Sequence, residues 1–162
     1  MLRKTFFTML VIILLASGCA TPTPSPALTL LPQKMVPIEN AGLVCFKEYD
    51  AITKKLSGTF RPKGCFSSSC TVPQEQEVDV QLDNSQGALK FVTRFILLDT
   101  TVRTTGAPAC TADCDGGGEV PFKFADVMSG TYTVILGDRE MGSLGVPPTF
   151  TEAAGICFGE LH

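Results

Sequence analysis

The stretch from Glu77 to Leu82, EVDVQL, decides the fold class, because its polar and apolar residues alternate without interruption. Successive side chains of a β-strand point to opposite faces, so Val78, Val80 and Leu82 share one face. The two acids and Gln81 share the other face. The pattern predicts a strand with one face in the core and one in water, which is typical of antiparallel sheets.

Further short runs of β-forming residues flank this strand, and Gly, Pro, Ser and Asn residues separate them. After the first apolar segment, we find no stretch of ten or more residues with the 3.6-residue period of an amphipathic helix. Together with the strand at 77–82, these runs predict an all-β fold. The architecture that we expect is an antiparallel β-sandwich of about seven strands. The other runs lie at 43–49, 54–60, 89–99, 120–127, 131–136 and 155–158.

Individual runs carry further expectations. The run at 89–99 is apolar on both faces and predicts a central strand that is partly covered on both sides. Pro121 lacks a backbone N–H, so the run at 120–127 predicts an edge strand or a bulge. Residues 141–148, MGSLGVPP, are interpreted as an apolar loop that either contacts a partner or, as we favour, packs over the end of the sandwich. The predicted core comprises the inward positions Val44, Phe46, Val78, Val80, Leu82, Leu89, Phe91, Phe95, Leu97, Phe122, Phe124, Tyr132, Val134, Leu136, Ile156 and Phe158.

The start of the chain resembles a bacterial lipoprotein signal peptide. Arg3 and Lys4 precede an apolar segment, 6–15, that is shorter than the ~20 residues of a membrane-spanning helix. Small residues then lead to Cys19 in LASGC, which resembles the lipoprotein cleavage box, although the box usually has Leu where this chain has Ala16. The resemblance implies that residues 1–18 are removed and that Cys19 carries the lipid.

Two other interpretations of this segment remain open. It is an ordinary secretory signal, cleaved near residues 16–18, or it is an uncleaved anchor. In the lipoprotein interpretation the anchored chain is extracytoplasmic, and Ala20 after Cys19 favours export to an outer membrane where the cell has one. Acyl chains on one residue give stable anchoring, since each buried methylene contributes ~0.8 kcal/mol.

A proline-rich tether follows the lipidated cysteine, and we assign it to residues 19–40. Proline alternates with Thr or Ser at 21–26, which favours an extended polyproline II spacer. An O-glycosylated or ligand-presenting segment is the alternative. We place the β-sandwich domain at 41–162, one domain with enough residues for a single core.

Charge limits the partners that this chain is expected to bind. The formal net charge is −3, and loss of the leader removes Arg3 and Lys4, which makes it more negative. An acidic chain without basic clusters is a poor nucleic-acid binder, so we expect no nucleic-acid partner. The expected partners are the membrane, through the lipid on Cys19, and an envelope protein or glycan.

The chain has seven cysteines, and six remain when Cys19 is set aside. An even number in an exported chain predicts three disulfides, although the spacing does not fix which cysteines pair. Because two pairs are close in sequence, we expect Cys65–Cys70 and Cys110–Cys114, with Cys45–Cys157 joining the ends of the domain. A zinc site formed by the two close pairs is the alternative, although neither has the usual Cys-x2-Cys spacing.

No catalytic set is recognisable in the sequence. The only histidine is His162, the last residue, so an arrangement built around a central histidine base is not expected. Asp113, Asp115 and Glu119 suggest either a carboxylate pair that acts on a glycoside or a calcium loop. We favour simple solvation of these carboxylates, and we expect neither a metal nor a cofactor.

Residues 113–134, DCDGGGEVPFKFADVMSGTYTV, resemble the carboxypeptidase regulatory-like, or prealbumin-like, β-sandwich family. The resemblance covers an Asp/Gly turn, a strand with alternating aromatic residues and a Gly-x-Tyr strand opening, and it does not extend to the first half of the domain. It implies a non-catalytic accessory domain, in some members linked to carbohydrate or protein binding. Tyr132 is expected to bury its ring and to bond the backbone through its hydroxyl.

Together these observations predict a lipid-anchored cell-envelope protein whose β-sandwich binds or supports a partner without catalysis. One alternative is an extracytoplasmic enzyme that depends on a metal or on a carboxylate pair. The other is a purely structural component of the envelope.

Overall fold

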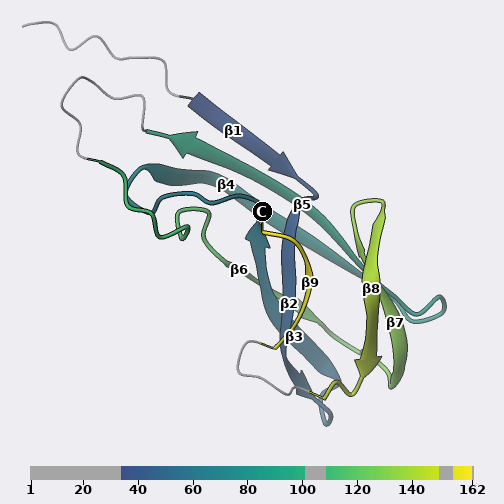
Figure 1. Ribbon diagram of the computed structural model, residues 1–162. Helices are drawn as coiled ribbons and strands as arrows, with labels where there is room; N and C mark the ends of the chain where they lie inside the picture. Colours follow the sequence, from purple (N-terminus) through teal and green to yellow (C-terminus); the bar gives the residue numbers. More distant parts are fainter. Residues whose placement is uncertain (1–33, 101–108, 150–154, 162) are drawn as a thin grey trace, which may run out of the picture.

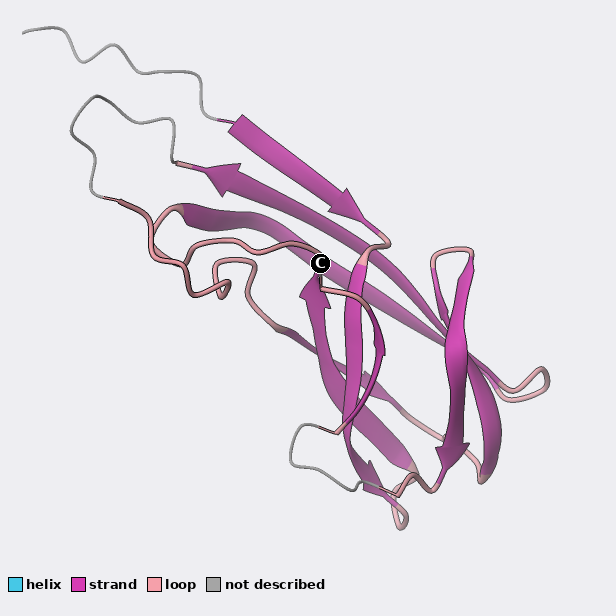
Figure 2. Ribbon diagram, viewed as in Figure 1, coloured by secondary structure: helices cyan, strands magenta, loops and turns pink. Residues whose placement is uncertain are grey.

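The computed structural model describes residues 34–100, 109–149 and 155–161, and within them the chain forms nine strands and no helix (Figures 1 and 2). The strands form two sheets, which confirms the predicted all-β class, and the predicted leader lies outside the described residues. The strands are β1 Lys34–Glu39, β2 Gly42–Asp50, β3 Lys55–Pro62, β4 Thr71–Asp83, β5 Ala88–Asp99, β6 Val120–Phe124, β7 Gly130–Leu136, β8 Arg139–Val146 and β9 Ile156–Gly159.

Strand β5 is the centre of the larger sheet, as its apolar sequence predicts. β4 pairs with it antiparallel over its whole length. The opposite edge of β5 is shared by two strands, since β1 pairs with residues 94–99 and β7 pairs with residues 88–91. β8 completes this sheet beside β7. The pair of β5 and β7 is parallel, which differs from the antiparallel pairing that we expected throughout.

The smaller sheet has the order β6-β3-β2-β9. β6 lies at its edge, and Pro121 is part of it, in agreement with the expectation from the missing N–H. β9 pairs with β2 at the other edge, and Cys45 lies directly opposite Cys157 in that pair. The two are joined by a disulfide, as predicted.

The core between the sheets is rich in phenylalanine. Phe46, Phe91 and Phe122 contact one another edge to face, with ring centroids 4.8–6.1 Å apart. Each such aromatic pair contributes about 0.5–1.5 kcal/mol beyond burial of its area. Tyr132 buries its ring, and its hydroxyl oxygen accepts a hydrogen bond from the Met128 N–H at 3.1 Å, as expected.

The observed core differs in part from the predicted one. Five of the expected residues are only half-buried at its margin: Val78, Val80, Leu82, Ile156 and Phe158. Sheet edges receive less cover than sheet centres, which explains this difference, because β4 and β9 are edge strands. Five residues of the buried core cluster were not predicted: Leu56, Phe60, Val127, Leu144 and Val146.

Two of the segments assigned to linker or loop are strands. Residues 34–39, placed in the tether, form β1, because their backbone pairs with β5. Residues 139–146 form β8, so the loop predicted at 141–148 is wrong over most of its length. The strand was missed because glycine is unusual within strands. Gly142 is needed here because a Cβ at that position would lie 2.9 Å from the Phe158 ring.

Candidate functional site

Two loops at one end of the sandwich, residues 63–70 and 109–119, lie side by side, and we call them the paired loops. Disulfides join them at Cys65–Cys114 and at Cys70–Cys110. The backbone N–H of Gly116 donates a hydrogen bond to the Phe66 carbonyl oxygen at 2.7 Å. Gly116 is buried, and a Cβ there would lie 2.3 Å from the Ser67 carbonyl oxygen, so only glycine permits this approach.

The disulfide pairing corrects two predictions. Cys65–Cys70 and Cys110–Cys114 were expected as local bridges, and both are wrong. Each cysteine instead pairs across the two loops, because the loops run alongside each other. The bridges therefore span 49 and 40 residues of sequence instead of closing two short turns.

Hydroxyl groups and one carboxylate link the paired loops further. Asp113 accepts hydrogen bonds from the Ser68 hydroxyl, from the Ser68 N–H at 2.9 Å and from the Thr111 hydroxyl at 2.9 Å. The hydrogen bonds from Ser68 and Thr111 hold the pKa of the Asp113 carboxyl well below its usual range, although desolvation opposes them. Asp113 is therefore ionised at neutral pH and links the two loops through hydrogen bonds.

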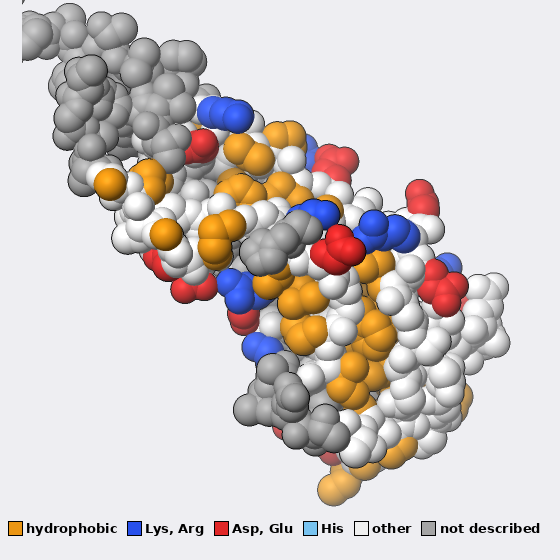
Figure 3. Space-filling model, in the orientation of Figure 1, with side chains coloured by type: hydrophobic (Ala, Val, Ile, Leu, Met, Phe, Trp, Pro, Cys, Tyr) orange, Lys and Arg blue, Asp and Glu red, His pale blue; other side chains and the backbone are white. Residues whose placement is uncertain are grey.

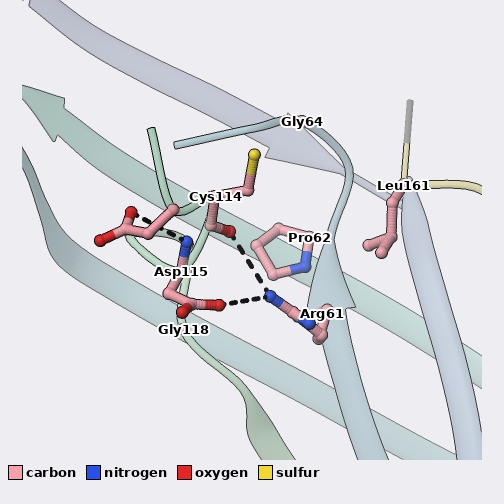
Figure 4. A pocket seen from close by; sticks show the side chains of 9 residues that line it. Arg61, Pro62, Gly64, Cys114, Asp115, Gly118 and Leu161 are labelled. Atoms are coloured by element: carbon pink, nitrogen blue, oxygen red, sulfur yellow. Dashed lines mark hydrogen bonds and ion pairs between the residues drawn. The ribbon is translucent and has the colours of Figure 1, made fainter. Parts of the chain in front are cut away.

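A cleft of about 210 Å³ opens beside the paired loops and is lined on one side by Arg61 from the end of β3 (Figure 4). The Arg61 guanidinium donates hydrogen bonds to the Asp115 carboxylate at 3.0 Å and to the Cys114 carbonyl oxygen at 3.4 Å. Pro62 and Leu161 form the apolar part of the lining. The cleft is therefore a small recess with one cation, already paired with a carboxylate of the chain itself.

Glu119 extends this ion-pair group along the surface. Its carboxylate lies 3.7 Å from the Arg61 Nε and 3.3 Å from the Lys47 Nζ. Of the three carboxylates considered for calcium, Asp113 accepts hydrogen bonds from Ser68 and Thr111. Asp115 and Glu119 pair with cations and share Arg61. Within the described residues, no group of three or more His, Cys, Asp or Glu side chains could hold a metal ion. The calcium-loop interpretation of these acids is therefore not supported by their placement.

Each carboxylate of this group bonds to hydroxyl groups or cations of the chain itself. Cys19 and His162 lie outside the described residues. Arg61 was not singled out in the sequence, because one arginine at the end of a strand forms no motif. The ion pair of Arg61 forms only because the turn at 115–118 places the Asp115 carboxylate beside the guanidinium.

The three intramolecular disulfides indicate that the chain folds in an oxidising, extracytoplasmic compartment. Over the described residues, no helix is long and apolar enough to cross a bilayer. Comparisons of the chain with family models, with curated proteins and with solved structures found no match.

Proposed function

We propose that this protein is a lipid-anchored, extracytoplasmic envelope protein whose β-sandwich is a non-catalytic binding or accessory module. The observation that carries the proposal is the LASGC segment at 15–19 in a chain whose other six cysteines all form disulfides. That pairing leaves Cys19 as the one cysteine with another role. A thiol at the end of a signal-like segment is the lipid acceptor of bacterial lipoproteins, which this segment resembles.

The paired loops are the surface that we assign to partner binding. Two disulfides and the Asp113 hydrogen bonds restrain them, and a rigid surface loses little entropy when it binds. The cleft beside Arg61 offers an apolar lining and polar groups that suit a side chain of a protein or a glycan substituent. Its partner is an envelope protein or glycan.

Expression of the full chain in a bacterium tests the anchor. We expect radiolabelled palmitate to enter the wild-type protein and the protein to sediment with membranes. Cys19→Ala should abolish the label, whereas Ser17→Ala, which keeps a small residue in the segment, should retain it. A Cys19→Ala protein that still carried the label would overturn the assignment.

Enzymatic turnover tests the non-catalytic part of the proposal. The lipidated protein, incubated with cell-wall glycans and peptides, should release no product above a heat-inactivated sample. If turnover appeared and Asp113→Asn or Asp115→Asn abolished it, the protein would be an enzyme of the carboxylate type. Turnover that these variants left unchanged would also contradict a non-catalytic module.

A further inference from the structure

The outer end of the β1, β5 and β4 sheet carries an apolar surface that is partly exposed among the described residues. Met35, Leu98 and Val72 lie directly opposite one another on the three strands. In the next row Ile96 lies between Pro37 on β1 and Glu75 on β4. We call the five apolar residues of the two rows the apolar patch, and Glu75 lies at its edge. Met35 is 50% exposed and Val72 is 46% exposed.

Strand alternation shows that the patch faces away from the core. Phe95 and Leu97, the alternate residues of β5, are fully buried on the opposite face. The inner face of this end is therefore covered, while the outer face presents Ile96 and Leu98, which are half-buried by their neighbours. Apolar side chains are visible at the surface along β1 in Figure 3.

Charged residues end the patch toward the middle of the sheet. Arg94, the next outward residue of β5, lies 3.4 Å from Glu75 and 4.0 Å from Glu39. Beyond this charged row, Val92 is 48% exposed on the same face and is separated from the patch. The surface is thus apolar at the outer end of β1 and charged further inward.

The apolar end is also where the chain leads to the proposed anchor. Fourteen residues separate Cys19 from Lys34, the first residue of β1, and they span at most about 50 Å when fully extended. The patch begins at Met35, one residue later. A tether of this length holds the patch at high effective concentration near the bilayer, so weak binding suffices to dock it.

We propose that the apolar patch rests on the surface of the lipid bilayer that holds the anchor. This inference depends on the proposed lipidation of Cys19. The negative net charge of the chain favours a zwitterionic surface over an anionic one. Docking there would cover the patch, leave the charged row of Arg94 at the headgroup level and direct the remainder of the sandwich away from the membrane.

The chain lacks tryptophan, so one introduced indole gives a reporter without background. The full lipidated protein carrying Val72→Trp is reconstituted in phosphatidylcholine vesicles with and without brominated acyl chains. We expect a shift of the emission to shorter wavelength and quenching by the bromolipid. The matched variant Val92→Trp, on the same face outside the patch, should show neither effect. Adding Met35→Glu to Val72→Trp should remove the quenching, because it places a charge inside the patch.

Flotation of the same samples separates the two proposals. Protein that fails to float with vesicles contradicts the lipid anchor itself. Protein that floats while Val72→Trp remains unquenched contradicts only the docking. An emission shift that grows with protein density and is insensitive to bromolipid would assign the patch to contact between two copies of this chain, which also overturns the docking.

Discussion

Asn40 occupies the point where two strands meet on one edge of β5, and it bonds to Thr93 there in both directions. The Thr93 N–H donates to the Asn40 Oδ1 at 2.9 Å, and the Asn40 N–H donates to the Thr93 carbonyl oxygen at 3.1 Å. On the far side of this junction, the Gly137 N–H donates to the Phe91 carbonyl oxygen at 2.8 Å. The Asn40 side chain thus continues the hydrogen bonding along this edge of β5 between the part that pairs with β1 and the part that pairs with β7.

Replacement of Asn40 by Ala should destabilise the fold. It leaves the Thr93 N–H without its acceptor, which costs about 1–3 kcal/mol in a part-buried setting. Asn40 also has a left-handed backbone, φ 47°, which Ala adopts at a cost of about 1 kcal/mol or more. Urea denaturation measures the loss. Asn40→Asp keeps the acceptor oxygen and should lose less; equal losses for both variants would contradict the role of the side chain.

Tryptic mapping of the unreduced protein should show the disulfides between the paired loops directly. Cleavage after Lys63, Lys90, Arg103 and Lys123 places Cys65 and Cys70 on one peptide, and Cys110 and Cys114 on another. The pairing in the structure joins the two peptides into one species. Two separate peptides, each with an internal disulfide, would instead support the local pairs Cys65–Cys70 and Cys110–Cys114. Further cleavage before Asp113 and after Phe66 separates the two cysteines of each peptide and so identifies each bridge.

Substitution of Arg61 by Met tests the ion-pair group of the cleft. It removes the donor to the Cys114 carbonyl and the cation between Asp115 and Glu119, so we expect a loss of about 1–2 kcal/mol in unfolding free energy. Lys63→Met is the control, because its exposed pair with Glu160 at 3.5 Å contributes about 0–1 kcal/mol. Similar losses in urea for the two variants would show that Arg61 has no special structural role.

The stability of the protein should depend on pH through Asp113. Because hydrogen bonds from Ser68 and Thr111 lower its pKa in the fold, the unfolded chain takes up the proton first as the pH falls. Its contribution is complete above the unfolded pKa of about 4 and is lost as the pH falls through the lower folded pKa. Hydrogen bonds from Thr53 and Ser85 lower the pKa of Asp50 and Asp83 in the same direction.

In the Asp113→Asn variant, the free energy of unfolding should therefore decrease less steeply below pH 4 than in the wild type. Some decrease should remain, because Asp50 and Asp83 still take up protons. Denaturant titrations between pH 5 and pH 2 measure this slope. Parallel curves for the wild type and the variant would show that the charge of Asp113 does not contribute to stability.

The sequence predicted those parts of the fold in which one strand carries its own pattern. The alternation at 77–82 and the apolar run at 89–99 both correspond to strands, β4 and β5. β1 was missed because Pro37 and flanking prolines suggest a tether, and an edge strand tolerates proline where it needs no donor. β8 was missed because Gly142 and Gly145 weaken its pattern, although Leu144 and Val146 alternate correctly.

The candidate site was less predictable because it depends on contacts between distant segments. Asp113, Asp115 and Glu119 were chosen for their type, but their partners Ser68, Arg61 and Lys47 lie 45, 54 and 72 residues away in sequence. The same reason explains the wrong disulfides. Proximity in sequence favoured local bridges, whereas the packing of one loop against the other decided the pairing.

The position of β1 has a mechanical consequence for a chain that is held at Cys19. A pull on the tether enters the fold at Lys34 and loads β1 first, at the end where Lys34 pairs with Asp99. Separation of β1 from β5 adds six residues, about 20 Å of contour length, to the tether. The load next arrives at β2, where the Cys45–Cys157 bridge closes 112 residues of the sandwich into a covalent loop. Under load, β1 can therefore detach from β5 while the disulfide-closed part of the sandwich stays folded.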